Sequence, residues 1–432
     1  MRDLRFYITS NLGGGGQTVS RLFNYLEVLN KINSDYINIL LNFRYLKYYK
    51  ESPPYYKYTP VFSGEIIENL DKSKDEISTF ISNKNNFDYL ETQNEDELTK
   101  DVSVLLDSGA GALIRNLLSK KEYSKDSVVS YFEELVEYHI NYLEDKKPNY
   151  AIALDYCDKN TYKDLQGKNP NISNIVNELI TNKDKQLNLL EKSLKLSSEK
   201  NISTKLYAPL HGESEGEIVN NYKNIINIEN QLGLKFHGVA LGGLRQFSSK
   251  SNGNSLIGNI IARVKEIEPN KKIHVLGSSG LQRIIPFVYA GADSFDCHTY
   301  WRRANDGSRT ASTESKIVVP LLNSDKQLVE YKEDSFKNIN LVDVDINLWP
   351  CDCFVCKDFG ISNLLNLYSN SKNTEEYYFA KILIYFHSVY QYQFLFDKLH
   401  NMENSEILNF VNSLKNTKFT VKLKENLEEI TI

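Results

Sequence analysis

Three cysteines lie close together in the sequence CDCFVC, at Cys351, Cys353 and Cys356. Three thiolates on one short loop are the soft ligands that a tetrahedral Zn²⁺ site requires, whereas three thiols without a metal are the plainer alternative. The fourth ligand must come from elsewhere, and both His387 and His400 lie downstream in a stretch whose apolar pattern predicts a helix. Three cysteines and one histidine fill the coordination shell, so the predicted zinc is structural and has no open catalytic position.

Three aspartates follow apolar runs that predict strands. They are Asp107 in LLDSGAG, Asp155 in YAIALDYCD and Asp296 in ADSFDCHTY. Taken singly, each is most simply a solvated residue that caps the following helix. Carboxylates that converge on one rim repel one another, which raises the pKa of at least one and separates an acid from a nucleophile. Together the three aspartates predict an active site.

Two further strand ends carry residues that suit a ligand site. His211 and Gly212 stand in APLHGES, and a lone histidine of this kind is otherwise structural. Gly242 and Gly243 in LGGL allow the backbone to approach a flat ligand closely, with an ordinary tight turn as the alternative. Both pairs are therefore candidates for the same site as the aspartates.

A basic and aromatic cluster follows Asp296. It consists of Tyr300, Trp301, Arg302, Arg303 and Arg309. Arginines that contact phosphates and rings that stack on bases suit a nucleic-acid substrate, whereas the alternative is a solvated surface loop. The cluster is the candidate nucleic-acid contact.

Strand and helix patterns alternate from about residue 100 onward. The expected strands are Val102–Asp107, Tyr150–Asp155, Lys205–Leu210, Gly238–Leu241, Ile273–Leu276 and Ser294–Cys297. The expected helices are Ser127–Glu144, Ile175–Ser198, Ile218–Leu232, Leu256–Ile267, Leu281–Ala290 and Tyr377–His400. Units this regular predict an α/β protein with a closed (β/α)8 (TIM) barrel, in which the loops after the strands build the active site.

The bulk properties are those of a folded protein. The chain has 432 residues, 41% of them hydrophobic, and a net charge of -5, which argues against a generally basic coat for nucleic acid. We expect an N-terminal barrel start with a divergent insertion in residues 1–100, the barrel core in 101–345 and a zinc-binding subdomain with C-terminal helices in 346–432. With no signal peptide, no membrane span and no disulfide framework apparent, we expect a cytoplasmic protein.

Taken in order, these motifs resemble those of the guanine transglycosylase superfamily of tRNA base-exchange enzymes. The stretch DSGAG is similar to the family's DSGG(F)Q, LDYCD to FDEC, LGGL to its GGL turn, and GADSFDC to GxDxFDC. The sequence CDCFVC followed by His387 resembles its CxCxxC…H zinc motif, which favours His387 over His400. The resemblance covers roughly Val102 to His387 and is weak or absent in the first hundred residues.

The resemblance implies roles for individual residues. Asp296 would attack the anomeric carbon and form a covalent glycosyl-enzyme, and Asp107 would be the general acid/base, so that two displacements retain the sugar configuration. Asp155 would accept hydrogen bonds from the Watson–Crick edge of the base. The other expected substrate contacts are Ser108, Gly109, His211, Gly212, Gly242, Gly243 and Leu244, the last three through the backbone near the base carbonyl and the 7-substituent.

Departures from the family pattern favour one branch of it. His211 stands where the tRNA enzymes have glutamine, and FDCHTYWRRANDG replaces FDCVxPTRxAR. With these changes the sequence resembles the DNA-modifying branch of the family, which exchanges guanine in DNA for a 7-deazaguanine such as preQ0. Helper proteins are then possible partners. A duplex substrate requires the guanine to be flipped out, and the cluster of Tyr300, Trp301 and the arginines is expected to hold the extruded strand.

Two alternatives remain at this stage. The first is a tRNA-guanine transglycosylase with a divergent base pocket. The second is a non-catalytic paralogue that only binds nucleic acid or a partner subunit, which the retention of all three aspartates disfavours.

Overall fold

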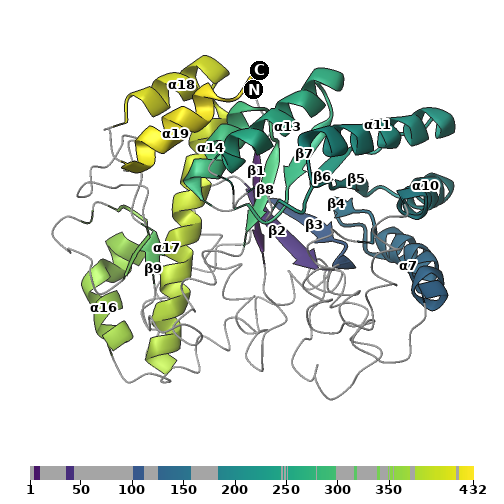
Figure 1. Cartoon of the computed structure of the whole chain (residues 1–432). Coiled ribbons are helices and arrows are strands. Elements are labelled where there is room, and N and C mark those ends of the chain that lie inside the picture. Colours follow the sequence, from purple (N-terminus) through teal and green to yellow (C-terminus); the bar gives the residue numbers. More distant parts are fainter. Residues whose placement is uncertain are drawn as a thin grey trace.

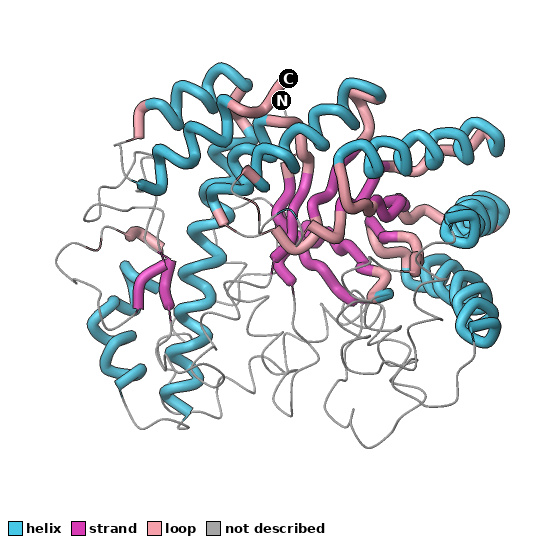
Figure 2. The backbone as a smooth tube through the Cα atoms, in the orientation of Figure 1, coloured by secondary structure: helices cyan, strands magenta, loops and turns pink. Residues whose placement is uncertain are grey.

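The computed structural model describes residues 4–9, 36–42, 101–110, 125–156, 183–244, 247, 250, 252–278, 280–297, 316–318, 338–340, 349, 351–353, 355–369, 375–414 and 418–432. Its central feature is a closed barrel of eight parallel strands (Figures 1 and 2). The strands are β1 (Arg5–Thr9), β2 (Tyr36–Asn42), β3 (Asp101–Asp107), β4 (Tyr150–Ile152), β5 (Lys205–Leu210), β6 (Gly238–Leu241), β7 (Lys272–Val275) and β8 (Ser294–Cys297). They pair in chain order, and β1 pairs with β8 to close the ring. The predicted barrel is therefore confirmed.

The predicted strands are all present, with one clear difference in length. The expected strand Tyr150–Asp155 ends at Ile152, because only one further backbone hydrogen bond, from Ala153 to the Tyr207 carbonyl at 2.9 Å, continues the pairing with β5. Asp155 therefore follows β4 instead of belonging to it. This places its side chain in the loop region of the barrel mouth.

Strands β1 and β2 were not predicted individually. Their sequences, RFYIT and YINILLN, carry Arg5 and Asn38 at positions where an apolar pattern would be expected. The β2–β3 register pairs Asn38 with Ser103, and the Arg5 guanidinium donates to the Ser103 hydroxyl at 3.3 Å. Because these polar residues lie on the inner face of the barrel, a search for apolar runs did not predict the two strands.

The barrel interior is filled by side chains from several strands. Tyr7, Tyr150 and Tyr207 form a cluster of rings, with centroids 6.4 Å apart for the first pair and 6.0 Å for the second. The His274 ring lies 5.7 Å from Tyr7 and 6.2 Å from Tyr207. Because β1, β4, β5 and β7 are not all neighbours, these contacts can form only inside a closed ring. The interior is a packed core, as is typical of such barrels.

Helices surround the barrel on its outer side (Figure 1). They are α7 (Lys125–Lys146), α10 (Lys183–Glu199), α11 (Glu215–Leu232), α13 (Gly253–Ile267) and α14 (Leu281–Tyr289). Each predicted helix is present, although residues 175–182 of the expected Ile175–Ser198 lie outside the described part. The ends of α11 follow ordinary capping rules: the Ser214 hydroxyl accepts from the Glu217 amide at 3.2 Å, and Gly233 ends the helix at a φ of 65°.

A C-terminal group of helices completes the described structure. It comprises the π-helix η5 (Val355–Gly360), α16 (Ile361–Ser369), α17 (Glu375–His400), α18 (Asn404–Asn412) and α19 (Lys418–Glu428), beside a small antiparallel pair of β9 (Lys316–Val318) and β10 (Asn338–Asn340). Helix α17 packs directly on the barrel wall. Phe6 of β1 stacks on Tyr392 and Phe396 at 5.3 and 5.0 Å, and Phe295 of β8 lies 5.4 Å from Phe396. The proposed domain boundaries at 100 and 345 stay a prediction.

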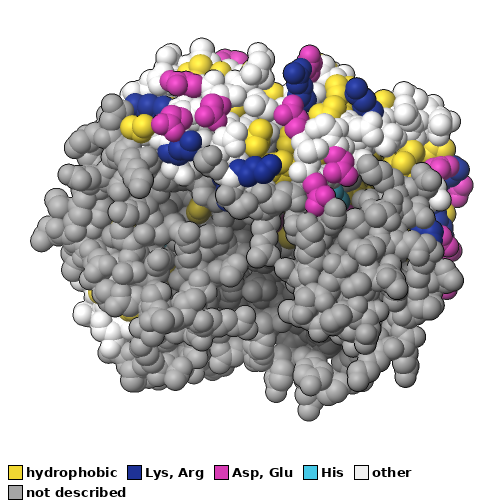
Figure 3. Space-filling model, in the orientation of Figure 1, with side chains coloured by type: hydrophobic (Ala, Val, Ile, Leu, Met, Phe, Trp, Pro, Cys, Tyr) yellow, Lys and Arg dark blue, Asp and Glu magenta, His cyan; other side chains and the backbone are white. Residues whose placement is uncertain are grey.

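None of the helices in the described part of the chain combines the length and the apolar character needed to cross a membrane. On the face shown in Figure 3, the described Lys and Arg side chains are interspersed with Asp and Glu.

Candidate functional site

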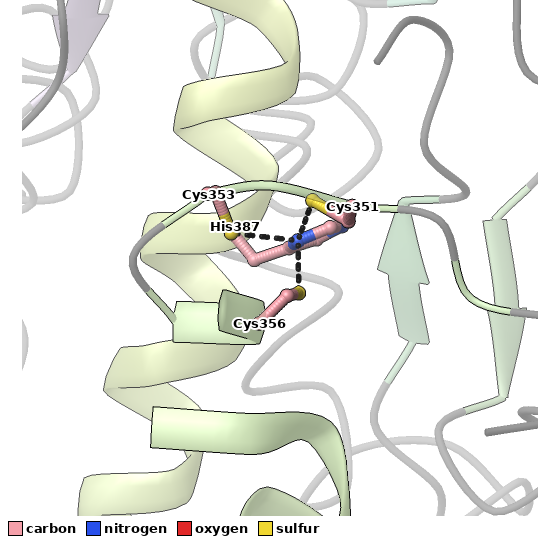
Figure 4. A group of neighbouring side chains, drawn as sticks. All are labelled: Cys351, Cys353, Cys356 and His387. Atoms are coloured by element: carbon pink, nitrogen blue, oxygen red, sulfur yellow. Dashed lines mark hydrogen bonds between the residues drawn. The ribbon is translucent and has the colours of Figure 1, made fainter. Parts of the chain in front are cut away.

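The cysteine loop and α17 bring four metal-ligand atoms together (Figure 4). The Nδ1 atom of His387 lies 3.5, 3.4 and 3.3 Å from the sulfur atoms of Cys351, Cys353 and Cys356. All four ligand atoms lie within 4.8 Å of one another. A tetrahedral Zn²⁺ with ordinary bond lengths separates its sulfur and nitrogen ligands by about 3.5 Å. The spacing of these residues therefore fits a metal ion of this size.

The electrostatics of the cluster also suit a cation. Burial raises the pKa of the Cys353 thiol well above its ordinary range, and the neighbouring Cys351 and Cys356 raise it further. Burial also raises the pKa of the Cys351 thiol, so thiolates at Cys351 and Cys353 are unfavourable by themselves. A bound divalent cation reverses this, because metal binding needs deprotonated thiols and stabilises them.

Side chains outside the four ligands hold the sulfur atoms in place. The Gln391 amide nitrogen donates to the Cys351 sulfur at 3.1 Å, and the Trp349 indole N–H donates to the Cys356 sulfur at 3.1 Å. Such outer contacts orient ligands and tune their affinity for the metal. Neither residue was predicted, since an amide and an indole carry no ligand signal of their own in a sequence.

The choice between the two candidate histidines is settled by geometry. His400 lies at the C-terminal end of α17, where its Nδ1 atom accepts a hydrogen bond from the Leu4 amide at 3.2 Å. It therefore anchors the start of the chain. His387 is the histidine of the cluster, as the family resemblance implied.

The predicted catalytic residues lie at the carboxyl end of the barrel. Asp107 is the last residue of β3, and Asp296 lies on β8 one residue before its end. Because the strands are parallel and form one ring, Asp107, Asp296 and the loop residue Asp155 are all at the same end. After Asp107 the chain turns at the buried Ser108 and at Gly109, which has a φ of 65°. A positive φ of this size suits glycine.

Asp155 is paired with His211. The Nε2 atom of His211 lies 2.5 Å from the Asp155 Oδ2, and the Asn221 amide holds the His211 carbonyl at 2.7 Å. Asp155 is only 3% exposed, so this imidazole is a close partner for a buried carboxylate. Two strand-end residues that the sequence marked separately thus form one unit.

The glycines after β5 and β6 stand where a side chain would not fit. A Cβ atom on Gly242 would lie 2.7 Å from the Cε1 of His211, and one on Gly212 would lie 2.7 Å from the Cγ1 of Ile218. Gly243 adopts a φ of 67° and is followed by the half-buried Leu244. Gly242 is therefore required by the position of His211, in addition to any contact with a ligand.

Asp296 is held from the neighbouring strand. Its Oδ1 atom accepts from the Gly277 amide at 2.9 Å and lies 3.2 Å from the Nε2 of His274. Asp296 is 5% exposed, and His274 is fully buried. His274 was not predicted as a site residue, because a single histidine within the apolar run KIHVL is more typical of the hydrophobic core. Its signal was the alternation of the strand, which puts it on the inner face with Leu276.

The expected nucleic-acid contacts Tyr300, Trp301, Arg302, Arg303 and Arg309 lie outside the described residues. The described site thus comprises the three aspartates with their partners at the barrel mouth, and the metal cluster on the flank.

Comparison with known proteins identifies the family. Residues 181–419, more than half of the chain, match the family model of queuine tRNA-ribosyltransferase (TGT). The chain belongs to this family, which lies within the superfamily that the motifs resemble. The matched region includes Asp296 and all four residues of the metal cluster.

Individual relatives are similar over a part of their length. A queuine tRNA-ribosyltransferase of Thermodesulfovibrio yellowstonii is 28% identical over 187 residues, which cover 42% of this chain and 43% of the relative. One from Buchnera aphidicola is 27% identical over 228 residues, 52% of each chain. One from Francisella tularensis is 28% identical over 134 residues, 31% of each chain. The chain thus spans about half the length, or less, of the relatives it matches.

Proposed function

We propose that this protein is a nucleic-acid guanine transglycosylase, a pentosyltransferase, and that it exchanges guanine in DNA for a 7-deazaguanine base such as preQ0. One observation carries the proposal. A chain of the TGT family has a closed barrel with Asp107, Asp155 and Asp296 at the end where barrels of this kind bind substrates.

The proposed reaction has two displacements. Asp296 attacks C1′ of the target nucleotide, the bond from C1′ to the guanine nitrogen breaks, and Asp107 gives a proton to the departing base. The incoming base then loses a proton to Asp107 and attacks C1′, which releases the Asp296 carboxylate. Inversion at each step retains the sugar configuration overall.

The pair of Asp155 and His211 is proposed to bind the base. A carboxylate accepts the N–H groups on the Watson–Crick edge of guanine, and the contact with His211 holds Asp155 in one orientation. Gly242, Gly243 and Leu244 bring backbone groups close to the base. Gly212 follows His211 and packs against Ile218, where a larger residue would not fit. Ser108 and Gly109 form the turn beside Asp107.

The metal of the cluster is proposed to be zinc. Cys351, Cys353, Cys356 and His387 would hold it with a complete shell, so it would supply folding energy and no chemistry. Because α17 carries His387 and also packs on β1 and β8, the metal would fix the cysteine loop to the wall of the barrel that carries Asp296. Thiol ligands of this kind fit a reducing compartment such as the cytoplasm.

Two features support DNA as the substrate. His211 replaces the glutamine of the tRNA enzymes, and its contact with Asp155 gives the base pocket a different composition. The sequence after Asp296 also differs, and its rings and arginines, Tyr300, Trp301, Arg302, Arg303 and Arg309, are proposed to hold an extruded strand. Helper proteins that open the duplex would be natural partners.

A tRNA substrate is the second candidate. It is favoured by the similar proteins themselves, which are named queuine tRNA-ribosyltransferases. At 27% and 28% identity over part of the chain, this similarity supports the reaction class more strongly than the choice of nucleic acid.

One experiment separates the candidates. The protein is incubated with labelled guanine or labelled preQ0 and with either plasmid DNA or tRNA, and the label in each nucleic acid is counted. We expect incorporation into DNA. Incorporation into tRNA alone would overturn the DNA assignment, and binding of nucleic acid without incorporation into either would favour a non-catalytic paralogue. The Asp296→Ala protein serves as the control for enzymatic incorporation.

A further inference from the structure

His274 lies inside the barrel between the nucleophile and the aromatic core. It stands on β7 opposite Ser294 of β8 in the register of the two strands. Its side chain is fully buried, and its ring contacts those of Tyr7 and Tyr207 edge-on. These rings fix the plane of the imidazole, so that its two nitrogen atoms point at defined partners.

The imidazole bridges two residues of the neighbouring strand. Its Nδ1 atom lies 2.9 Å from the Ser294 hydroxyl, and its Nε2 atom lies 3.2 Å from the Asp296 Oδ1. Ser294 and Asp296 are two positions apart on β8 and therefore face the same side of the sheet. One ring on β7 thus spans both, and any rotation of the ring would break both contacts.

The polarity of these contacts assigns the proton. A carboxylate only accepts hydrogen bonds, so the Nε2 atom must carry the hydrogen that Asp296 receives. In a neutral imidazole the Nδ1 atom is then an acceptor, and the Ser294 hydroxyl donates to it. The Asp296 contact therefore places the proton on Nε2, and the Ser294 hydroxyl holds the opposite side of the ring.

We propose that His274 is a positioning residue for the nucleophile: with its Nε2–H donated to Asp296 and its Nδ1 side held by Ser294, it keeps Asp296 in the orientation that attacks C1′. This inference rests on the proposed function, in which Asp296 is the nucleophile. The Gly277 amide is the second donor to the same oxygen, at 2.9 Å. Two donors on Oδ1 fix the rotation of the carboxylate, and the attacking lone pair belongs to the other oxygen. His274 itself touches neither the sugar nor the base.

The role predicts an effect on the chemical step alone. If the carboxylate loses one of its two fixed donors, it turns away from the line of attack, whereas the base pocket around Asp155 is unchanged. Misplacing a reacting group by about 1 Å costs on the order of 10²-fold in rate. The rate of adduct formation should therefore fall while the KM for the base stays constant.

Three variants test this in the full-length protein. His274→Phe fills the ring space without a donor, and we expect about a 10²-fold slower single-turnover adduct formation with a KM within about threefold of wild type. His274→Gln restores an N–H near the Nε2 position and should recover to within about tenfold of wild type. His237→Phe is the matched control, because His237 contacts the rings of Tyr150 and Tyr207 from the other end of the barrel. Its rate should not change.

Equal rates for His274→Phe and wild type would overturn the proposal. So would a loss that His274→Gln does not rescue, provided that thermal unfolding and metal content show both variants to be folded.

A second measurement does not depend on activity. The chain has seven histidines, so ¹⁵N-histidine NMR spectra of wild type and His274→Gln identify the signal of His274 by difference. We expect a ring protonated at Nε2 in wild type, and the same in Ser294→Ala, because Asp296 still accepts that hydrogen. A ring with no proton on Nε2 contradicts the assignment. If this protonation is observed but no nucleic acid is modified, the proposed function is wrong and the His274–Asp296 contact is still supported. If base exchange occurs and His274→Phe exchanges at the wild-type rate, the proposed function is supported and the positioning role of His274 is wrong.

Discussion

The two ends of the barrel treat carboxylates differently. At the amino end, Glu229 pairs with Lys271 at 2.6 Å, with both side chains at most 5% exposed. Asp293, just before β8, pairs with Lys265 and Lys272 at 2.8 and 3.0 Å. At the carboxyl end, Asp155 contacts the His211 imidazole at 2.5 Å, and Asp296 contacts the His274 imidazole at 3.2 Å and the Gly277 amide at 2.9 Å.

The difference separates stability from reactivity. A carboxylate neutralised by a buried lysine is part of the framework, because removing either partner leaves an unpaired charge in the interior. A carboxylate oriented by imidazole and backbone N–H groups keeps its position and can still form a new bond. This division agrees with the general rule that the amino end of such barrels carries stability and the carboxyl end carries catalysis.

The largest effect is expected at the carboxyl end. Asp296→Ala removes the proposed nucleophile, so both covalent adduct formation and base exchange should fall by about 10⁴-fold or more. Stopped incubations with labelled nucleic acid measure both. Because Asp296 is held by the His274 imidazole and the Gly277 amide, the free energy of unfolding should change far less than the rate. Residual exchange near the wild-type rate would remove Asp296 from the mechanism.

The amino end should show the opposite behaviour. Glu229→Leu removes the closer carboxylate of the buried Lys271 and leaves it with the more distant Glu268, at 3.7 Å. We expect a loss of up to about 3–5 kcal/mol in unfolding free energy by denaturant titration. Exchange per folded molecule should remain unchanged. Glu266→Gln is the matched control, because it breaks the exposed pair with Arg263 and should leave the free energy of unfolding nearly unchanged. A Glu229 variant with full stability but lost activity would refute the division between the ends.

Variants beside the cluster of Cys351, Cys353, Cys356 and His387 test whether the metal contributes to stability alone or also to catalysis. Gln391→Leu removes the N–H donor to the Cys351 sulfur and should weaken zinc affinity by about 10- to 100-fold, measured by competition with a chelator. Gln393→Leu is the control, since Gln393 of the same helix donates instead to Asp397. Zinc-saturated Gln391→Leu should exchange bases at the normal rate. A reduced rate at full zinc occupancy would mean that the metal acts on the chemistry.

The smallest effect is expected in the base pocket. Gly242→Ala places a Cβ atom 2.7 Å from the His211 Cε1, so His211 must shift away from Asp155. We expect the KM for the base to rise by about tenfold, equivalent to about 1.4 kcal/mol, with little change in kcat. Gly216→Ala on α11 is the control, because nothing lies within 4 Å of its added Cβ. A change in kcat with an unchanged KM would mean that Gly242 affects the chemical step and not the binding of the base.

The sequence was informative where partners are local or where periodicity is regular. Cys351, Cys353 and Cys356 lie within six residues of one another, so their spacing alone predicted three of the four ligands. The fourth stayed open between His387 and His400 until the family resemblance favoured His387. The strands from β3 to β8 were predicted by apolar runs, whereas Arg5 and Asn38 concealed β1 and β2. These inner-face polar residues are satisfied or enclosed by other strands, which no local pattern can reveal.

Contacts between distant segments were out of reach for the same reason. His400 meets the Leu4 amide across 396 positions, and His274 reaches Asp296 from a different strand. The pairing of Asp155 with His211 depends equally on the closure of the barrel, although both residues were marked individually. The contacts between these residues therefore depend on the topology of the barrel, which the composition of the sequence does not specify.

The central claim is that Asp296 forms a covalent bond to the sugar of the target nucleotide. The most direct test is to incubate the protein with DNA in the absence of free base, quench with denaturant, digest both polymers and map the adduct by mass spectrometry. We expect a nucleotide-sized mass increase on the peptide that contains Asp296, which disappears when preQ0 is added before the quench. An adduct mapped to Asp107 or Asp155, or efficient base exchange with no adduct on any peptide, would contradict this account.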